Sequence, residues 1–537
     1  MIKNRLVLLL FCCSLLISLL AGCGTRSNVV VEIDDAQVRN LAKLCKVWGF
    51  AKYTHQSFLT GERCWDEELL ALIPVIRFAD EDEVNDILYE WFVGLGDDGY
   101  DLDWEAYRVA WEAYYEGRKA YFYNWFIELI DAGYQFDKEF IQSQLQVFDD
   151  AINFMLEYGD VSDWADLQVF HEAFYSSLGM EQKVRQRVDK EWITDASFLG
   201  EALSNRLSRF VEIQIFDRSN APVYFDPMGR SFFTNQKDHR AMGFSDIEYR
   251  LLGLFRLWNT IKYFYPHMDI IDYDWNELLL DYIPIMLERT DRISYRNTLI
   301  SLARRLDDAH VRFDGLPVHE IIWHDLSRVT SSHVLLENNI GLINPVEFVF
   351  NWGDTRYIME TFADTDGLII DLRQYPCGSI VFDLAEYIVE ESQPFFILSF
   401  PAQSIPGVFI DQSTVYSGGI TSPYAFFYDR PVVILMNRST MSRAETAVMS
   451  LRNGKNVTVM GSNSIGGNGD VTFLPLPGGI QMMFTGLGVY TPQGGQTHRI
   501  GLSPDIHVEP TAAGLREGRD ELMEAAIAFL LAGEADE

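Results

Sequence analysis

The chain is poor in cysteine and in basic residues. Six cysteines occur among 537 residues, and they have neither the paired spacing of a zinc site nor the regular spacing of a disulfide framework. Lysine and arginine together number 43 against 78 aspartates and glutamates, which gives a formal net charge of −35. Such an excess of negative charge disfavours binding to nucleic acid and to anionic lipid. We therefore expect no metal, no other cofactor and no nucleic-acid partner.

Long apolar runs are also missing, with one exception at the amino terminus. Lys3 and Arg5 precede an apolar run over residues 6–20, which is short for a membrane-spanning helix of about 20 residues. Small residues then lead to Cys23. This order is typical of a bacterial lipoprotein signal. We predict that residues 1–22 are removed and that a lipid on Cys23 anchors the protein to a membrane of the cell envelope, outside the cytoplasm. An uncleaved anchor helix is the alternative.

Cleavage at Cys23 would leave three cysteines, at positions 45, 64 and 377. An odd number without metal-ligand spacing favours isolated buried thiols over a disulfide between Cys45 and Cys64.

The amino-terminal half contains an internal repeat with an offset of 210 residues. Residues 48–53 (Trp-Gly-Phe-Ala-Lys-Tyr) correspond to residues 258–263 (Trp-Asn-Thr-Ile-Lys-Tyr). Further pairs follow without a gap: Trp65 with Trp275, Pro74 with Pro284, and Asp97-Asp98 with Asp307-Asp308. Both copies have the pattern of helices around an Asp-rich loop, so duplication of one helical unit explains them better than chance. Between the copies, a stripe of Trp and Tyr from residue 104 onwards predicts helices that bury these rings.

The strongest functional signal is a serine near the carboxyl-terminal end. The apolar run 431–436 breaks into a Ser/Thr-rich turn, and helix-type sequence begins at Arg443. This order predicts a strand-to-helix turn at which Ser442 exposes its hydroxyl while the amide of Arg443 points at a substrate carbonyl. Serine also caps helices for purely structural reasons, so the turn by itself does not identify a nucleophile.

Other motifs surround this turn in a fixed order. They are residues 367–378 (an apolar strand that ends in a Pro/Gly turn), 459–461, the glycine-rich 464–469, 476–479, 500–506 and 518–522. Over residues 339–530 this order resembles the catalytic domain of the C-terminal processing (tail-specific) serine peptidases and their relatives, including the tricorn core. The resemblance implies a crotonase/Clp-like α/β core with Ser442 as the nucleophile.

The resemblance also implies the remaining catalytic groups. In tricorn-like relatives a histidine in an Asp-x-His turn is the general base; His310 matches this turn, whereas the first repeat has Tyr100 instead. By family position, the amides of Gly378 and Arg443 form the oxyanion hole. A Ser-Lys arrangement is disfavoured because the turn after the nucleophile helix lacks the family's lysine.

Several positions depart from the family pattern. Tyr375 and Cys377 replace an asparagine and a glycine, Ala309 replaces the serine before the base, and His498 is nearest to the position of the glutamate that orients the base. The sequence therefore leaves the orienting group open; Asp307 and Asp308 are nearby carboxylates. Glu445 is interpreted as a favourable acid at a helix start.

Only 29 residues separate His310 from Ile340. A PDZ domain requires about 80 to 100 residues, so we predict none there.

Together these patterns predict an α+β multidomain protein with a duplicated helical amino-terminal region and a crotonase/Clp-like peptidase core. The predicted parts are the signal peptide 1–22, repeat copy one 23–103, a helical and irregular connection 104–245, repeat copy two 246–315 and the catalytic domain 335–532. The predicted function is an exported, lipid-anchored serine endopeptidase that acts on polypeptides. The alternative, favoured by Tyr375, Cys377 and Ala309, is an inactive relative that binds peptides or apolar ligands in the same cleft.

Overall fold

The computed structural model describes residues 33–96, 104–131, 138–162, 164–177, 183–211, 220–226, 229–317, 330–346, 354–378, 380–403, 405–412, 414–420 and 425–533. The predicted signal peptide, Cys23 and Tyr100 lie outside these residues. In the part of the chain that is described, no helix is both long enough and apolar enough to cross a bilayer. Within the same part, Cys45, Cys64 and Cys377 form no disulfide.

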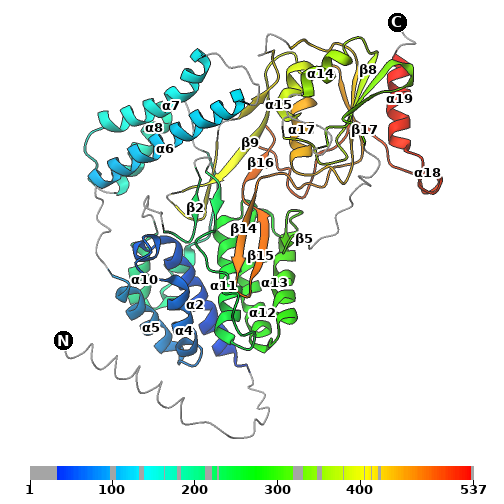
Figure 1. Ribbon diagram of the computed structural model, residues 1–537. Coiled ribbons are helices and arrows are strands. Elements are labelled where there is room, and N and C mark those ends of the chain that lie inside the picture. The colour runs from blue at the N-terminus through cyan, green and yellow to red at the C-terminus, as the bar shows by residue number, and fades with distance from the viewer. Residues whose placement is uncertain are drawn as a thin grey trace.

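Two helical units build the lower half of the molecule (Figure 1). The first consists of α2 (Asp35–Thr54), α3 (Gln56–Leu59), α4 (Trp65–Ile76) and α5 (Glu81–Gly94). The second consists of α11 (Ile247–Phe264), α12 (Trp275–Glu288) and α13 (Arg292–Ala303), with short 3-10 turns at η2 (Met268–Ile270) and η3 (Arg304–Leu306). Aspartates before α2, α12 and α13 cap these helices by accepting hydrogen bonds from first-turn amides.

The same contacts recur in both units at positions 210 residues apart. The indole of Trp48 donates to the carbonyl of Trp65 at 2.8 Å, and Trp258 donates to Trp275 at 2.7 Å. Lys52 lies over the Trp48 ring and Lys262 over the Trp258 ring. At the contact between α2 and α11, the corresponding rings of Tyr53 and Tyr263 lie 5.4 Å apart.

Gly49 stands where α2 meets α11. A Cβ atom added there would lie 1.8 Å from Oδ1 of Asn259, the residue 210 positions later. Asn259 cannot move away freely, because its amide donates to the carbonyls of Cys45 and Phe255 inside the core. We therefore expect Gly49→Ala to lower the free energy of unfolding by about 1–3 kcal/mol, measured by urea denaturation.

Gly94 in α5 provides the matched control, because a Cβ there meets nothing within 4 Å. Gly94→Ala is expected to leave stability unchanged or to raise it by up to about 1 kcal/mol. Equal stability of Gly49→Ala and the wild type would contradict the close contact between the two helices.

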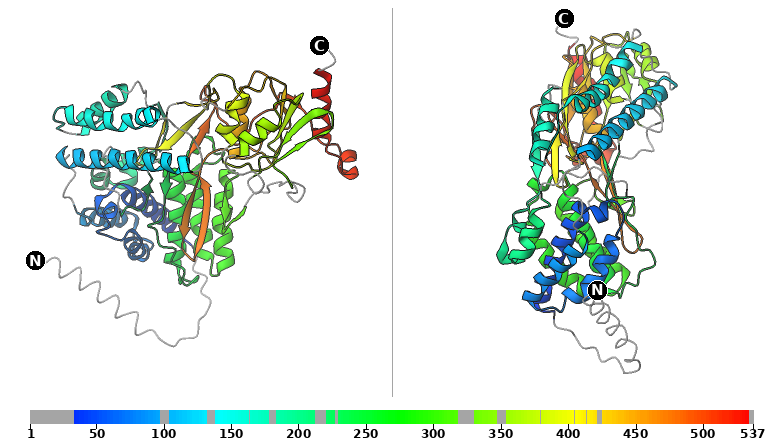
Figure 2. Two further views of the ribbon diagram at one scale, coloured as in Figure 1. Left: turned by 45° about the horizontal axis from the view of Figure 1, so that its top comes forward. Right: turned by 90° about the vertical axis from the view of Figure 1, so that its left-hand side faces the viewer.

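Three helices form an arm that stands out from the rest of the molecule (Figure 2). They are α6 (Trp104–Asp131), α7 (Lys138–Glu157) and α8 (Trp164–Ser177). The predicted burial of the aromatic stripe holds for Tyr107 and Trp111, which pack against Phe170 and Phe174. It is wrong for Trp125, which is 43% exposed, whereas the adjacent Phe126 is buried, because Trp125 lies on the outer side of α6 at this end of the helix.

Short elements connect the arm to the second helical unit. They are β1 (Lys183–Arg187), η1 (Glu191–Ile193), α9 (Ala196–Leu199), α10 (Glu201–Ser208), β2 (Tyr224–Phe225) and β3 (Ser231–Phe232).

A six-stranded sheet is the centre of the carboxyl-terminal half. Its order is β17-β13-β12-β8-β7-β6, in which only β6 runs antiparallel to its neighbour. The strands are β6 (His333–Leu335), β7 (Ile340–Ile343), β8 (Gly367–Asp371), β12 (Val432–Met436), β13 (Val457–Gly461) and β17 (Ile506–His507). β8 and β12 are buried at every position, which explains their continuous apolar sequence.

Helices cover both faces of this sheet (Figure 1). Ile370 and Ile434 pack on one face with α14 (Asp354–Thr361), α15 (Ile380–Asp383), α16 (Ala385–Ile388) and α17 (Arg443–Leu451). Ile369 and Val433 pack on the other face with α19 (Glu521–Gly533), which follows α18 (Ala512–Glu517). The mixed helix and sheet content confirms the predicted α+β class at this coarse level.

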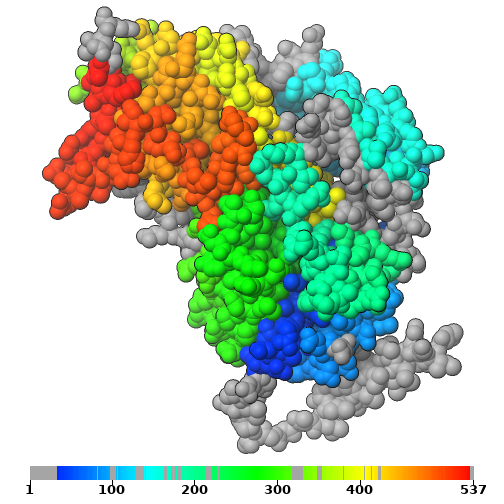
Figure 3. Space-filling view, turned by 180° about the vertical axis from the view of Figure 1, so that it is seen from behind, coloured from blue at the N-terminus to red at the C-terminus, as the bar shows by residue number. Residues whose placement is uncertain are grey.

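A long hairpin joins the two halves. Its strands β14 (Val471–Leu476) and β15 (Ile480–Thr485) leave the upper half and lie along the second helical unit, where β15 pairs with β4 (Arg312–Phe313) and β4 with β5 (Leu316–Pro317). Arg256 and Tyr295 donate to the hairpin carbonyls of Pro475 and Pro477. Seen from behind, the second unit, in green, continues directly into the carboxyl-terminal half (Figure 3).

A second sheet lies beside the hairpin. β9 (Gln393–Pro401) pairs with β10 (Val408–Asp411), β11 (Val415–Ser417) and β16 (Gly488–Tyr490), and β1 extends it at β10.

Candidate active site

Ser442 lies at the predicted strand-to-helix turn. β12 ends at Met436, and Ser442 is the residue that precedes α17, with φ 54° and ψ −119°. A non-glycine residue at positive φ carries backbone strain that the surroundings must hold. Thr440 contributes by donating its hydroxyl proton to the carbonyl of Leu372, at the end of the neighbouring strand β8. The local sequence thus places a half-buried serine at a sharp turn beside a buried parallel sheet.

The side chain of Glu445 stabilises this turn by hydrogen bonds. Its buried carboxylate accepts hydrogen bonds from the amides of Ser442, Gly466 and Gly467 at 2.9–3.1 Å and from the hydroxyl of Ser464 at 2.5 Å. Burial raises the pKa of Glu445 to about 7, against the effect of these donors. The interpretation of Glu445 as an acid near a helix start was incomplete, because the side chain ties the glycine-rich turn to Ser442. The Ser-x-x-Glu spacing of a capping box was the available signal.

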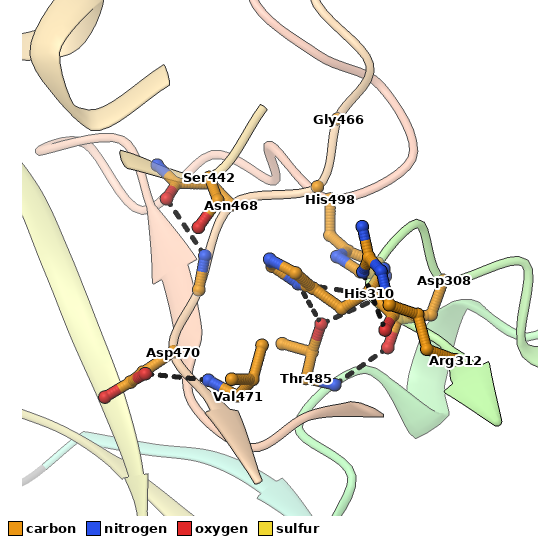
Figure 4. A network of polar contacts seen from close by, with 12 residues as sticks. Asp308, His310, Arg312, Ser442, Gly466, Asn468, Asp470, Val471, Thr485 and His498 are labelled. Carbon is orange, nitrogen blue, oxygen red and sulfur yellow. Dashed lines mark hydrogen bonds and ion pairs between the residues drawn. The ribbon is translucent and has the colours of Figure 1, made fainter. Parts of the chain in front are cut away.

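His310 lies in the turn between η3 and β4 and is 3% exposed. Its Nδ1 lies 2.9 Å from Oγ1 of Thr485, the last residue of β15. Oγ1 of Thr485 lies 2.9 Å from Oδ1 of Asp308, and the Thr485 amide donates to Oδ2 of the same carboxylate at 2.9 Å. The amide of His310 also donates to Oδ1 of Asp308 at 2.8 Å (Figure 4).

Burial sets the charge state of His310. It lowers the pKa of the ring to about 4, although the neighbouring Asp308 raises it. Burial also opposes ionisation of Asp308, but His498, His310 and two backbone amides keep the pKa of this carboxyl below its ordinary value. At neutral pH the site therefore holds a neutral imidazole beside an ionised carboxylate.

Gly467 marks the place where the His310 turn meets the Ser442 turn. A Cβ atom added to Gly467 would lie 2.9 Å from Cβ of Ala309 and 3.5 Å from Cγ of Met441. These two residues directly precede His310 and Ser442. Figure 4 shows the His310 ring pointing towards the side on which Ser442 and Asn468 lie. Within the described residues no hydrogen bond joins the two side chains, and such contacts are often long without substrate.

The turn 375–378 lies against the side chain of Arg443. The Arg443 guanidinium donates to the carbonyl of Pro376 at 3.1 Å and lies over the ring of Tyr375. The Cys377 amide donates to the carbonyl of Pro345, and the thiol is buried in the core. Among the described residues, no backbone acceptor is recorded for the amides of Gly378 and Arg443. Cys377 is thus excluded as an oxyanion donor, and the two predicted amides remain candidates.

His498 lies behind Asp308 and does not contact His310 by a hydrogen bond. Its Nε2 is 2.9 Å from the hydroxyl of Tyr265, and its ring stacks on that of His267 with the centroids 4.0 Å apart. Burial lowers the pKa of both rings.

Sequence reasoning missed Thr485 altogether, because a threonine at the end of a strand carries no distinctive signal.

Comparison with known proteins finds a family match for part of the carboxyl-terminal half. Residues 339–508 match the model of Peptidase family S41. This segment is a family S41 peptidase domain. Carboxy-terminal-processing proteases of that family are serine-type peptidases. Ser442 and Thr485 lie within the matched segment, whereas His310 and both helical units precede it.

Two curated relatives and one solved structure illustrate the range of similarity. The carboxy-terminal-processing protease of Bartonella bacilliformis is 23% identical over 38% of this chain and 46% of its own length. The carboxyl-terminal-processing protease of Synechocystis is 27% identical over 32% of this chain and 38% of its own length. The chain therefore spans less than half the length of these relatives. The crystal structure of a Parabacteroides merdae protein named as a candidate peptidase matches with 21% sequence identity and a TM-score of 0.47. The match covers 53% of this chain and 97% of the Parabacteroides chain.

Proposed function

We propose that this protein is a serine endopeptidase in which Ser442 is the nucleophile and His310 the general base. The observation that carries the proposal is the convergence at Gly467 of the turns that bear these two residues. The neutral state of His310 supports it, because only an uncharged ring accepts a proton.

The reaction follows from these positions. Ser442 Oγ attacks the carbonyl carbon of a peptide bond while its proton passes to Nε2 of His310. The carbonyl electrons move onto the oxygen, which the amides of Gly378 and Arg443 stabilise. When the C–N bond breaks, His310 returns the proton to the leaving amine. Water then enters, loses a proton to the same ring and attacks the acyl carbon; when the acyl–Oγ bond breaks, His310 gives that proton to Ser442 Oγ and the acid is released.

Further parts of the proposal concern the rest of the chain. The recurring Trp, Lys and Tyr contacts support an origin of the two helical units, residues 23–103 and 246–315, by duplication. The parallel sheet between α17 and α19 supports a crotonase/Clp-like core within residues 335–532. We further propose lipid anchoring through Cys23 in the cell envelope, a polypeptide substrate and the absence of a PDZ domain.

An inactive relative that binds peptides or apolar ligands in the same cleft is the second candidate. Tyr375 favours it, since its ring and the Arg443 guanidinium together occupy the turn beside the oxyanion position.

Labelling with a fluorophosphonate probe distinguishes the two candidates, since the probe reacts only with an activated serine. We expect the wild type to be labelled and Ser442→Ala to lose the label. Ser462→Ala, which removes another serine hydroxyl at the end of β13, is the control and should label normally. An unlabelled wild type that still binds peptides would support the inactive relative.

A further inference from the structure

The base of the proposed mechanism has no orienting acid at the position that the family resemblance indicates. Ala309 precedes His310 without a hydroxyl group, and His498 is bound to Tyr265 at the place nearest the expected glutamate. We infer that Thr485 and Asp308 take over this task as positioning residues, with the Thr485 hydroxyl linking the carboxylate to His310 Nδ1. This inference rests on the proposed function and names the groups that prepare its base.

The donor and the acceptor in each hydrogen bond between Asp308, Thr485 and His310 follow from the number of protons that each group carries. An ionised carboxylate only accepts hydrogen bonds, so the 2.9 Å contact between Asp308 Oδ1 and Thr485 Oγ1 must contain the hydroxyl proton. The hydroxyl has no second proton to give. In its 2.9 Å contact with His310 it must therefore accept, and the donor is Nδ1–H. A neutral ring with its proton on Nδ1 has a free lone pair on Nε2, which is the form a general base requires.

The carboxylate cannot do this alone. Its Oδ1 lies 3.9 Å from His310 Nδ1, which is beyond hydrogen-bond distance. Without the Thr485 hydroxyl, the ring would have no fixed partner on its Nδ1 side and would exchange between tautomers and orientations. The Thr485 hydroxyl therefore links the fixed carboxylate of Asp308 to the His310 ring and holds the ring in one orientation.

The three residues are held by more than this single chain of contacts. Asp308 and Thr485 are fully buried, and both Asp308 oxygens also accept backbone amides, one from each of the two segments. The pairing of β15 with β4 keeps Thr485 in register with the turn that bears His310. A group fixed in this way loses little entropy when the reaction begins.

Replacement of Thr485 tests the inference. Thr485→Val preserves the shape but removes the hydroxyl, and we expect kcat to fall by about 10²–10⁴ with little change in KM. Thr485→Ser restores the hydroxyl and should recover most of the rate. Thr472→Val is the matched control, because it removes another buried hydroxyl hydrogen bond, to the carbonyl of Ser231, from the neighbouring strand of the same hairpin. Its kcat should remain near that of the wild type.

The tautomer of His310 gives a readout that does not depend on turnover. Nitrogen NMR of histidine-labelled protein, with the His310 signals assigned by their loss in His310→Gln, should show Nδ1–H in the wild type and in Thr485→Ser. A mixture or Nε2–H is expected in Thr485→Val. Nε2–H in the wild type, or equal spectra and rates for Thr485→Val and Thr472→Val, would overturn the inference. If the wild type cleaved no peptide, the proposed function would be wrong. The tautomer of His310 would still show whether Asp308 and Thr485 orient the ring.

The pH profile adds a readout that a purely structural role of Asp308 would not move. The charged or titratable groups around His310 include Asp308, His267, His498, Arg312 and Asp470. Asp308 raises the pKa of His310, so Asp308→Asn should shift the acid limb of kcat/KM to lower pH as well as lower its plateau. An unshifted limb would show that the carboxylate does not act on the base.

Discussion

Replacing Ser442 and His310 together is expected to slow peptide hydrolysis no more than replacing Ser442 alone. Each alanine substitution should lower kcat by about 10⁴–10⁶, because neither group can perform its step without the other. A hydroxyl without a base is a poor nucleophile at neutral pH, and a base without the hydroxyl has no proton to take. The measurement is the rate of peptide hydrolysis for both single variants and the double variant, with the residual rate compared with that of buffer.

His333→Ala is the control for the histidine substitution. His333 lies on β6, where its ring packs on Tyr357 and Phe362 away from Ser442, and the variant should hydrolyse peptides at the normal rate. If the two losses multiplied in the double variant, Ser442 and His310 would act in separate steps. The Ser-His mechanism would then be wrong.

Gly378→Val is expected to lower kcat by about 10²–10³ while leaving substrate binding nearly intact. This is the effect of losing one preorganised donor to the oxyanion, because the donor acts mainly in the transition state. A branched side chain at this position restricts the backbone of a turn that packs against Arg443 through Tyr375 and Pro376. The measurement is a comparison of kcat and KM with those of the wild type on one peptide.

Cys377→Ala tests whether the loss of activity is specific to position 378 or also follows a change at the neighbouring residue. The Cys377 amide is already bound to Pro345 and the thiol lies in the core, so we expect lower stability but nearly unchanged kcat. An inactive Cys377→Ala beside an active Gly378→Val would mean that the oxyanion donor has been assigned to the wrong residue and that the thiol takes part in the chemistry.

The position of Ser442 at a strand-to-helix turn could be predicted because its signal is local. A strand buried on both faces needs a continuous apolar run, and the turn into α17 follows it within a few residues. Ser442, Arg443 and Glu445 are therefore close together whatever the remaining chain does. The role of Glu445, in contrast, depends on the glycine-rich turn 464–469, whose amides at Gly466 and Gly467 donate to its carboxylate.

His310 could be proposed only from a motif and a family resemblance, since it lies 132 positions before Ser442 in the sequence. Its approach to Ser442 depends on how the second helical unit docks on the sheet. That docking is made by the β14–β15 hairpin, by Arg256 and by Tyr295, whose partners are backbone carbonyls. Every residue, proline included, has a backbone carbonyl, so no pattern of side chains in the hairpin reveals where it will pack.

Local sequence patterns were enough to indicate a helical amino-terminal half, buried apolar strands and a serine at a sharp turn, and the family resemblance implied an α/β core. The link from Asp308 through Thr485 to His310 was decided by tertiary structure alone. One hydroxyl group joins Thr485 to His310 and to Asp308, which lie 175 and 177 positions earlier in the sequence, and a displacement of about 1 Å would lengthen these bonds beyond hydrogen-bond range. Such a link depends on the relative position of two strands, and that position results from packing over the whole domain.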